Sequence, residues 1–302
     1  MSFRNLSTVI AATIFALLVG AAVSWTVGGQ LVKPAPSKPT LPKDLPIGSF
    51  DIQSKSGSTI AGWHISAKNP KGLVLLFHGI RSSRSSMIER ARMFYQHQYS
   101  VMMIDFQAHG ESSGSAITVG HLERYDVIAT VKHARTIEPR IPIVVLGVSM
   151  GGASALFASP LNIDAMILES VYRDIEVAVR NRVKKRLGLL YWLPSEILLS
   201  QLGPRLDIEL SQLRPIDHIA SIRCPLFLMG GTVDKHTTAA ETREMFEAAA
   251  PPKDLWLVEG AAHVDLHQFA KQQYRDRVLS FIEKSIGNQK AMPANNALET
   301  DA

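Results

Sequence analysis

Short apolar runs alternate with segments of helical periodicity along most of the chain after residue 72. Runs of this length with few polar interruptions are typical of strands buried on both faces of a sheet. The predicted strands are residues 73–77, 101–105, 141–148, 165–169, 225–229 and 255–258, and the predicted helices are residues 87–98, 121–137, 151–158 and 266–286. This order predicts the α/β class, with a doubly wound, mostly parallel sheet covered by helices on both faces.

Residues 50–66 show a different pattern, in which apolar and polar positions alternate around a turn near Gly57. Alternation with a period of two is typical of antiparallel strands that have one solvated face. We expect this pair at one edge of the sheet, so that a single domain covers residues 48–287.

About fifty residues of helical character separate the strand that ends at Glu169 from the strand that begins at Pro225. This is too long for an ordinary loop, and it predicts a helical lid over residues 171–222. The segment carries basic side chains followed by an apolar stretch over residues 187–193; the basic residues are Arg173, Arg180, Arg182, Lys184, Lys185 and Arg186. A solvated helix face explains this pattern, and so does a surface that rests on anionic lipid.

No charged side chain lies between Arg4 and Lys33, and a helix over residues 6–32 would reach about 40 Å, against about 30 Å for a hydrocarbon core. We therefore expect residues 1–32 to be a transmembrane signal-anchor. A signal peptide cleaved near Ala21, Ala22 and Ser24 is the alternative, and it would give a secreted protein. The charges leave the orientation in the membrane open, but export of the domain over residues 48–287 across a bacterial inner membrane is the favoured outcome.

Two polar segments flank the domain. Residues 33–47 hold five prolines, which predicts an extended linker; they are Pro34, Pro36, Pro39, Pro42 and Pro46. Residues 288–302 are predicted to form a disordered tail.

Composition narrows the function classes only slightly. The 302 residues carry a formal net charge of +5, which is a modest excess and gives little support to a nucleic-acid partner. The single cysteine, Cys224, excludes an intramolecular disulfide framework. The oligomeric state stays open.

The strongest chemical signal is the G-x-S-x-G motif over residues 147–151, with Ser149 at its centre. It falls where a predicted strand ends and a predicted helix begins, which is the context of a nucleophile elbow. A sharp turn at this place needs small neighbours, and Gly147, Gly151 and Gly152 meet that need. The competing interpretation is a glycine-rich turn without chemistry.

A serine nucleophile requires a base and an orienting carboxylate. Asp234 and His263 both follow predicted strands, so they should meet Ser149 at the carboxyl edge of the sheet. Glu169 is the alternative acid, and His267 is the alternative base. The His263 and His267 pair lacks further ligands at a convincing spacing, so no metal and no cofactor is expected.

The order Ser149, Asp234, His263 resembles that of the α/β-hydrolase superfamily, in its bacterial branch of serine aminopeptidases and lysophospholipase-like esterases. The similarity extends over about residues 50–286 and includes the segments 76–79, 105–114, 147–152, 230–234 and 260–263. Residues 106–108 and 236–237 depart from the family pattern, and they bear on the substrate rather than on the triad.

The resemblance implies an oxyanion hole made by the N–H groups of Met150 and Ile80, with Arg81 as the second choice, and a packing role for His78. We therefore expect a serine hydrolase that cleaves a carboxylic ester of a small or lipid-like acyl substrate. An aminopeptidase, a thioesterase and a non-catalytic membrane-tethered binding protein are the alternatives.

Overall fold

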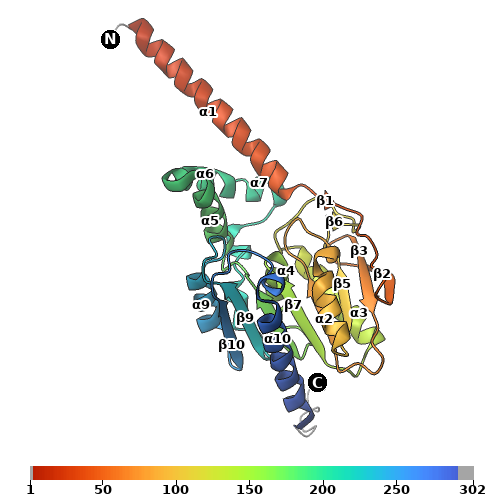
Figure 1. Ribbon diagram of the computed structural model, residues 1–302. Helices are drawn as coiled ribbons and strands as arrows, with labels where there is room; N and C mark the ends of the chain where they lie inside the picture. The colour runs from red at the N-terminus through yellow and green to blue at the C-terminus, as the bar shows by residue number, and fades with distance from the viewer. Residues whose placement is uncertain (1–2, 292–302) are drawn as a thin grey trace, which may run out of the picture.

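The computed structural model describes residues 3–291, and eight strands of this part form one sheet in the order β10-β9-β8-β7-β4-β5-β3-β2 (Figure 1). The strands are β2 (Ile47–Gln53), β3 (Thr59–Ile65), β4 (Leu73–Phe77), β5 (Ser100–Ile104), β7 (Ile143–Val148), β8 (Ala165–Glu169), β9 (Leu226–Gly231) and β10 (Lys253–Val258). The pairs from β5 to β10 are parallel, whereas β3 is antiparallel to both β2 and β5. The predicted sheet and its antiparallel edge are confirmed.

Helices cover both faces because successive residues of each buried strand point to opposite sides. On one face lie α2 (Ile88–Gln96) and α10 (Leu266–Ala291), and on the other lie α3 (Glu123–Ile137), α4 (Met150–Phe157) and α9 (Ala239–Ala248). In β8, Ile167 packs with the α2 and α10 side, while Met166 and Leu168 pack with the α3 and α4 side. The two cores therefore share one sheet.

The segment between β8 and β9 is helical, as expected. It contains α5 (Ile175–Leu187), η2 (Gly188–Tyr191), α6 (Trp192–Leu199), α7 (Leu202–Leu206), η3 (Leu210–Gln212) and α8 (Ile216–Ile219). We call residues 171–222 the insertion. Arg173 pairs with Asp174 and Glu244, and Arg180 pairs with Glu176 and Glu196, so part of its predicted basic surface is neutralised.

The N-terminal residues form α1 (Phe3–Val32), which projects from the domain on the side of α5, α6 and α7, opposite the end of α10 (Figure 1). Its residues 10–32 have a mean hydropathy of 2.1 and make the one helix of the described chain that is long and apolar enough to cross a membrane. A signal sequence has the same properties.

The proline-rich segment lies against the domain. Its strand β1 (Ala35–Pro36) pairs with β6 (His109–Gly110), and Asp44 pairs with Arg92 of α2. The segment therefore differs from the free spacer that its composition suggests, because backbone groups of residues 108–110 bind it. At the other end, α10 continues to Ala291, and residues 292–302 of the predicted disordered tail lie outside the described residues.

Candidate active site

Ser149 occupies the sharp turn between β7 and α4. Its backbone has φ 51° and ψ −114°, a conformation that is strained for a residue with a side chain. The Ser149 N–H donates to the Glu169 carbonyl at 2.8 Å, which ties the turn to the neighbouring strand β8. The surrounding fold thus holds the strained backbone in place.

Glycines make this turn possible because backbone crowds it on both sides. A Cβ on Gly147 would lie 2.6 Å from Cα of Gly152, and a Cβ on Gly151 would lie 2.4 Å from the Phe77 carbonyl oxygen. Both distances are too short for a carbon atom, so larger side chains would push β7, α4 and β4 apart. The spacing of small residues in the motif therefore follows from packing.

Asp234 and His263 lie in adjacent loops after the paired strands β9 and β10. The Val233 N–H donates to the Ala261 carbonyl at 3.1 Å, and a Cβ on Gly231 would lie 2.1 Å from that same oxygen. The two loops therefore touch through their backbones, and this contact brings residues 234 and 263 together.

The carboxylate of Asp234 is almost fully buried and its oxygens are fully used. Oδ2 lies 2.8 Å from His263 Nδ1 and accepts a hydrogen bond from Thr237 Oγ1 at 2.8 Å, while Oδ1 accepts from the N–H groups of His236 and Thr237. Burial raises the pKa of Asp234, but the hydrogen bond and charge of His263 and the two N–H donors outweigh it and hold the pKa below its usual value. Asp234 is therefore ionised at neutral pH and favours the His263 tautomer with its proton on Nδ1.

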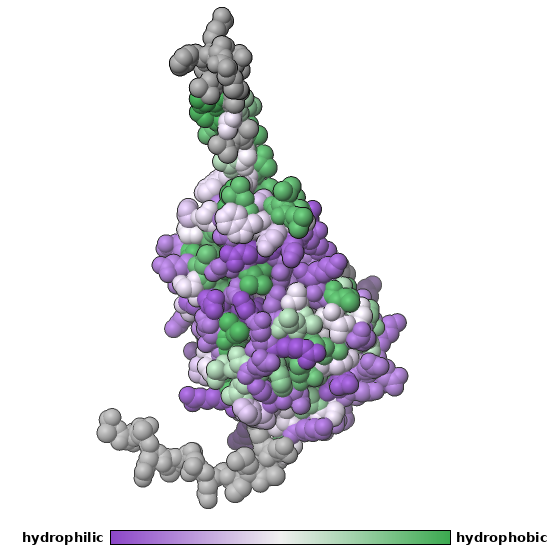
Figure 2. All heavy atoms as spheres, turned by 90° about the vertical axis from the view of Figure 1, so that its left-hand side faces the viewer, coloured by the Kyte–Doolittle hydropathy of each residue, from purple (hydrophilic) through white to green (hydrophobic). Residues whose placement is uncertain are grey.

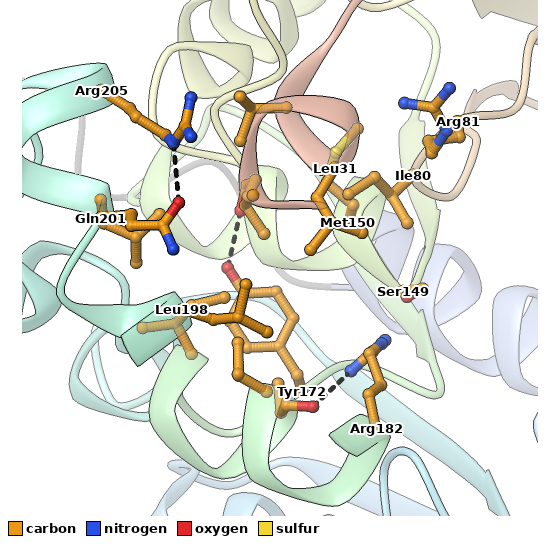
Figure 3. Close-up of a pocket in the computed structure, with 17 residues that line it drawn as sticks. Leu31, Ile80, Arg81, Ser149, Met150, Tyr172, Arg182, Leu198, Gln201 and Arg205 are labelled. Atoms are coloured by element: carbon orange, nitrogen blue, oxygen red, sulfur yellow. Dashed lines mark hydrogen bonds between the residues drawn. The ribbon is translucent and has the colours of Figure 1, made fainter. Parts of the chain in front are cut away.

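A cavity of about 200 Å³ opens beside Ser149, and residues from five parts of the chain line it (Figure 3). Ser149 and Met150 border it, as do Ile80, Tyr172 and Arg182. Asn181, next to Arg182, donates to the His236 carbonyl at 3.2 Å, so this part of the insertion contacts the Asp234 loop. Among the described residues, no hydrogen bond joins Ser149 Oγ to His263.

The loop after β4 passes close to Ser149, since a Cβ on Gly79 would lie 3.7 Å from Ser149 Cβ. In this loop the Arg81 N–H donates to His109 Nε2 at 3.0 Å, whereas the Ile80 N–H has no hydrogen-bond partner among the described residues. Met150 is the first residue of α4, where N–H groups have no partner within the helix. Ile80 and Met150, which border the same cavity as Ser149, thus have N–H groups without a partner among the described residues.

His78 is fully buried and connects two loops. Its Nδ1 lies 2.7 Å from the Gly79 carbonyl oxygen, and its Nε2 accepts from the Phe106 N–H at 3.1 Å. Burial, together with the nearby His109, lowers the pKa of His78 to about 3. A neutral ring with both nitrogens engaged fits the packing role expected for it.

The rival residues Glu169 and His267 are engaged elsewhere. Both carboxylate oxygens of Glu169 bind Arg90, and one of them also accepts from Tyr274. The His267 ring packs edge-on against Tyr274, 5.2 Å between ring centroids, and contacts neither Ser149 nor Asp234. The side chains of the alternative acid and base are thus engaged with Arg90 and Tyr274 and not with Asp234 or His263.

The sequence patterns did not assign a place in the site to Tyr172, Arg182, Leu31 or His236. Tyr172 and Arg182 of the insertion reach the cavity, as does Leu31 of α1. The His236 ring lies 5.2 Å from the His263 ring, and burial and Arg182 lower the pKa of His236 to about 4. Helix α9, which follows the Asp234 loop, could have been predicted from a capping signal in residues 238–241. There the Thr238 side chain accepts a hydrogen bond from the Glu241 N–H.

Residues 3–291 contain no group of three histidine, cysteine or carboxylate side chains placed to hold a metal ion.

Comparisons with known proteins agree with this fold. The model of the family described as serine aminopeptidase, S33, matches residues 68–213, a range that includes Ser149 and ends before Asp234. The uncharacterized protein YqkD of Bacillus subtilis is 24% identical over 245 residues, which are 78% of this chain and 79% of that protein. Human monoglyceride lipase is 25% identical over 236 residues, 66% of this chain and 77% of the lipase.

Solved structures give the same result. The Pyrococcus furiosus esterase Pf2001 superimposes with a TM-score of 0.71 at 25% identity, covering 84% of this chain and all of the esterase. An esterase of Exiguobacterium antarcticum shares the fold, with a TM-score of 0.58 and 16% identity. Taken with the eight-stranded sheet and the strand-turn-helix at Ser149, these similarities identify the chain as a hydrolase that belongs to the α/β-hydrolase superfamily.

Proposed function

We propose that the chain is a serine hydrolase that cleaves carboxylic esters through Ser149, His263 and Asp234. The observation that carries this proposal is the 2.8 Å hydrogen bond between His263 and Asp234, at the same sheet edge as the strained turn of Ser149. A buried carboxylate bound to one ring nitrogen leaves the other nitrogen free to act as a base.

In the proposed reaction, His263 Nε2 takes the Ser149 proton while Oγ forms a bond to the ester carbonyl carbon. The ester C–O bond then breaks, and the alcohol leaves with that proton. A water molecule attacks the acyl-enzyme in the same way, which releases the carboxylic acid and restores Ser149. Asp234 orients the ring and stabilises its positive charge in both steps.

The free N–H groups of Ile80 and Met150 support an oxyanion hole at these residues. Each donor of this kind is typically worth about 3 kcal/mol in the transition state. Arg81 is less suited because its N–H already donates to His109 Nε2.

The cavity lining favours an ester over a peptide with a free amino terminus. Arg81, Arg182 and Arg205 border the cavity, and its lining holds no acidic side chain among the described residues. An aminopeptidase needs a negative group to bind the substrate ammonium, and these arginines would repel it. The description of the matching family model supports an aminopeptidase, so this activity is the second candidate. A thioester would meet the same apolar lining as an ester.

We also propose that α1 is retained and tethers the hydrolase to a membrane. The small residues at which a signal peptide would be cut lie within the continuous helix. Ser24, among them, accepts two hydrogen bonds from Gln201 of the insertion. A protease that requires an extended chain would find this segment folded and packed.

Labelling with a fluorophosphonate probe tests the catalytic proposal on the full-length protein in detergent. Wild type should be labelled, Ser149→Ala should not, and kcat on p-nitrophenyl esters should fall about 10⁶-fold in that variant. Ser154→Ala is the matched control, because Ser154 is a buried serine of α4 whose hydroxyl donates to the Met150 carbonyl. Turnover retained by Ser149→Ala would refute the proposal. Faster cleavage of aminoacyl anilides than of esters would favour the aminopeptidase.

A further inference from the structure

The C-terminal turns of α1 border the cavity beside Ser149. Gly28, Leu31 and Val32 form part of its lining, facing residues of α4 and of the insertion. Figure 3 shows Leu31 beside Ile80 and Met150, with Leu198 and Gln201 of the insertion nearby. A helix that composition alone describes as a tether is thus part of the substrate-binding cavity.

The insertion holds one side of this helix. Gln201 Nε2 donates to the carbonyl and the hydroxyl of Ser24, at 3.2 and 3.0 Å, and the Arg205 guanidinium lies 3.8 Å from the centre of the Trp25 ring. Gly28 makes close approach possible, since a Cβ there would lie 2.2 Å from Gln201 Oε1. The contact therefore depends on a small residue at position 28.

The opposite side of the helix end is held by the domain core. The Arg81 guanidinium donates to the carbonyls of Gln30 and Lys33, both at 3.0 Å, and the Ile117 N–H donates to the Val32 carbonyl at 2.8 Å. Since Arg81 follows Ile80, one loop carries both the proposed oxyanion donor, Ile80, and the residue that binds the end of α1, Arg81. The helix end is thus a fixed wall of the cavity.

Apolar side chains continue outward from this wall. Leu189 and Leu190 at the tip of the insertion are 94% and 78% exposed, and Phe15 and Leu18 of α1 are 70% and 64% exposed. Figure 2 shows hydrophobic side chains on α1 and on the adjoining end of the domain. A patch of this kind marks contact with lipid or with a partner. A bilayer is the occupant that also accounts for the 23-residue hydrophobic span of α1.

We propose that α1 determines acyl-chain specificity, and that the cavity takes the acyl chain of an ester drawn from the bilayer in which α1 is inserted. The chain would lie along Gly28, Leu31 and Val32, with its carbonyl carbon at Ser149. This proposal rests on the serine hydrolase function proposed above. It adds two specificity-determining residues, Gly28 and Leu31, from outside the hydrolase domain.

The test uses full-length protein in phospholipid nanodiscs, with Gly28→Leu as the wall variant and Gly20→Leu as its matched control. A Cβ on Gly20 meets nothing within 4 Å, and the residue lies on the same helix away from the cavity. With p-nitrophenyl esters from acetate to dodecanoate, Gly28→Leu should lose about tenfold or more in kcat/KM on the long esters, and less than about threefold on acetate. Gly20→Leu should match wild type throughout.

Leu31→Ala tests the same wall without adding bulk, so the proposal stays testable if Gly28→Leu misfolds. The smaller side chain enlarges the cavity and should move the preferred ester towards longer chains. Identical chain-length profiles for wild type, Gly28→Leu and Leu31→Ala would overturn the role of α1. Release of fatty acid from esters in separate vesicles as fast as from esters in the same nanodisc would overturn the supply from the bilayer. If the fluorophosphonate probe does not label the wild-type protein, the underlying hydrolase function is wrong. Failure of the hydrolase function is therefore distinguished from failure of the proposal about α1.

Discussion

His263 Nδ1 lies 2.8 Å from Asp234 Oδ2, and Thr237 Oγ1 donates to the same oxygen. We predict that Asp234→Asn lowers kcat about 10⁴-fold, because an amide favours the wrong tautomer of His263. The midpoint of thermal unfolding should change little by comparison, since the backbone N–H donors still find an amide oxygen. Steady-state kinetics on a p-nitrophenyl ester, with the melting curve of each preparation, measures both quantities.

Glu169→Gln should give the opposite result. Glu169 and Arg90 form a fully buried ion pair that Tyr274 also joins, so removal of the charge leaves Arg90 incompletely compensated. We expect a loss of about 3 kcal/mol in the free energy of unfolding and a change in kcat of less than about tenfold. Urea unfolding checks the first value; a fall in kcat as large as that of Asp234→Asn would make Glu169 the catalytic acid.

His78 should make the fold sensitive to mild acid. Burial lowers its pKa from 6.5 to about 3 in the folded protein, so the unfolded chain takes up a proton first as the pH falls. The stabilisation that His78 gives is therefore complete above pH 6.5 and is lost from 6.5 towards 3, by about 1.4 kcal/mol per pH unit.

The difference in unfolding free energy between wild type and His78→Gln isolates this effect, because the other titratable groups contribute equally to both proteins. It should shrink between pH 7.5 and 5.0 in urea titrations. A difference that stays constant over this range would show that His78 is not buried in neutral form.

Gly231→Ala should separate the loops of Asp234 and His263. The new Cβ would meet the Ala261 carbonyl oxygen at 2.1 Å, and backbone at this place has little room to move. We expect about 3 kcal/mol of destabilisation together with a lower kcat, as for other overpacked positions. Gly203→Ala in α7 is the control, because nothing lies within 4 Å of its Cβ, and alanine in a helix adds up to about 1 kcal/mol. Equal melting temperatures for the two variants would contradict this account.

The parallel sheet could be predicted because its signal is local. Strands β4 and β8 have the predicted ends, since every residue of each is buried and apolar runs mark such strands directly. The glycines around Ser149 also act locally, through contacts between β7 and α4. Sequence therefore predicted the sheet and the turn that holds Ser149.

Features that depend on contacts between distant segments were not predicted. Arg182 was one of the six basic residues between Arg173 and Arg186, and only the packed structure distinguishes it as a residue of the cavity. Pairing of Ala35 with His109 was hidden because proline-rich composition is typical of free linkers. Helix α9 was missed although Thr238 and Glu241 carry its capping signal.

Arg81 and Ile117 donate hydrogen bonds to carbonyl groups in the last turn of α1, so rotation of the helix about its own axis would break these bonds. The domain and α1 would therefore rotate as one rigid body in a bilayer. The opening of the cavity would keep a constant depth relative to the lipid headgroups. For an enzyme held in a bilayer in this way, the relevant substrate concentration is the number of molecules per unit area of membrane. The rate at which enzyme and substrate meet is then set by lateral diffusion in two dimensions.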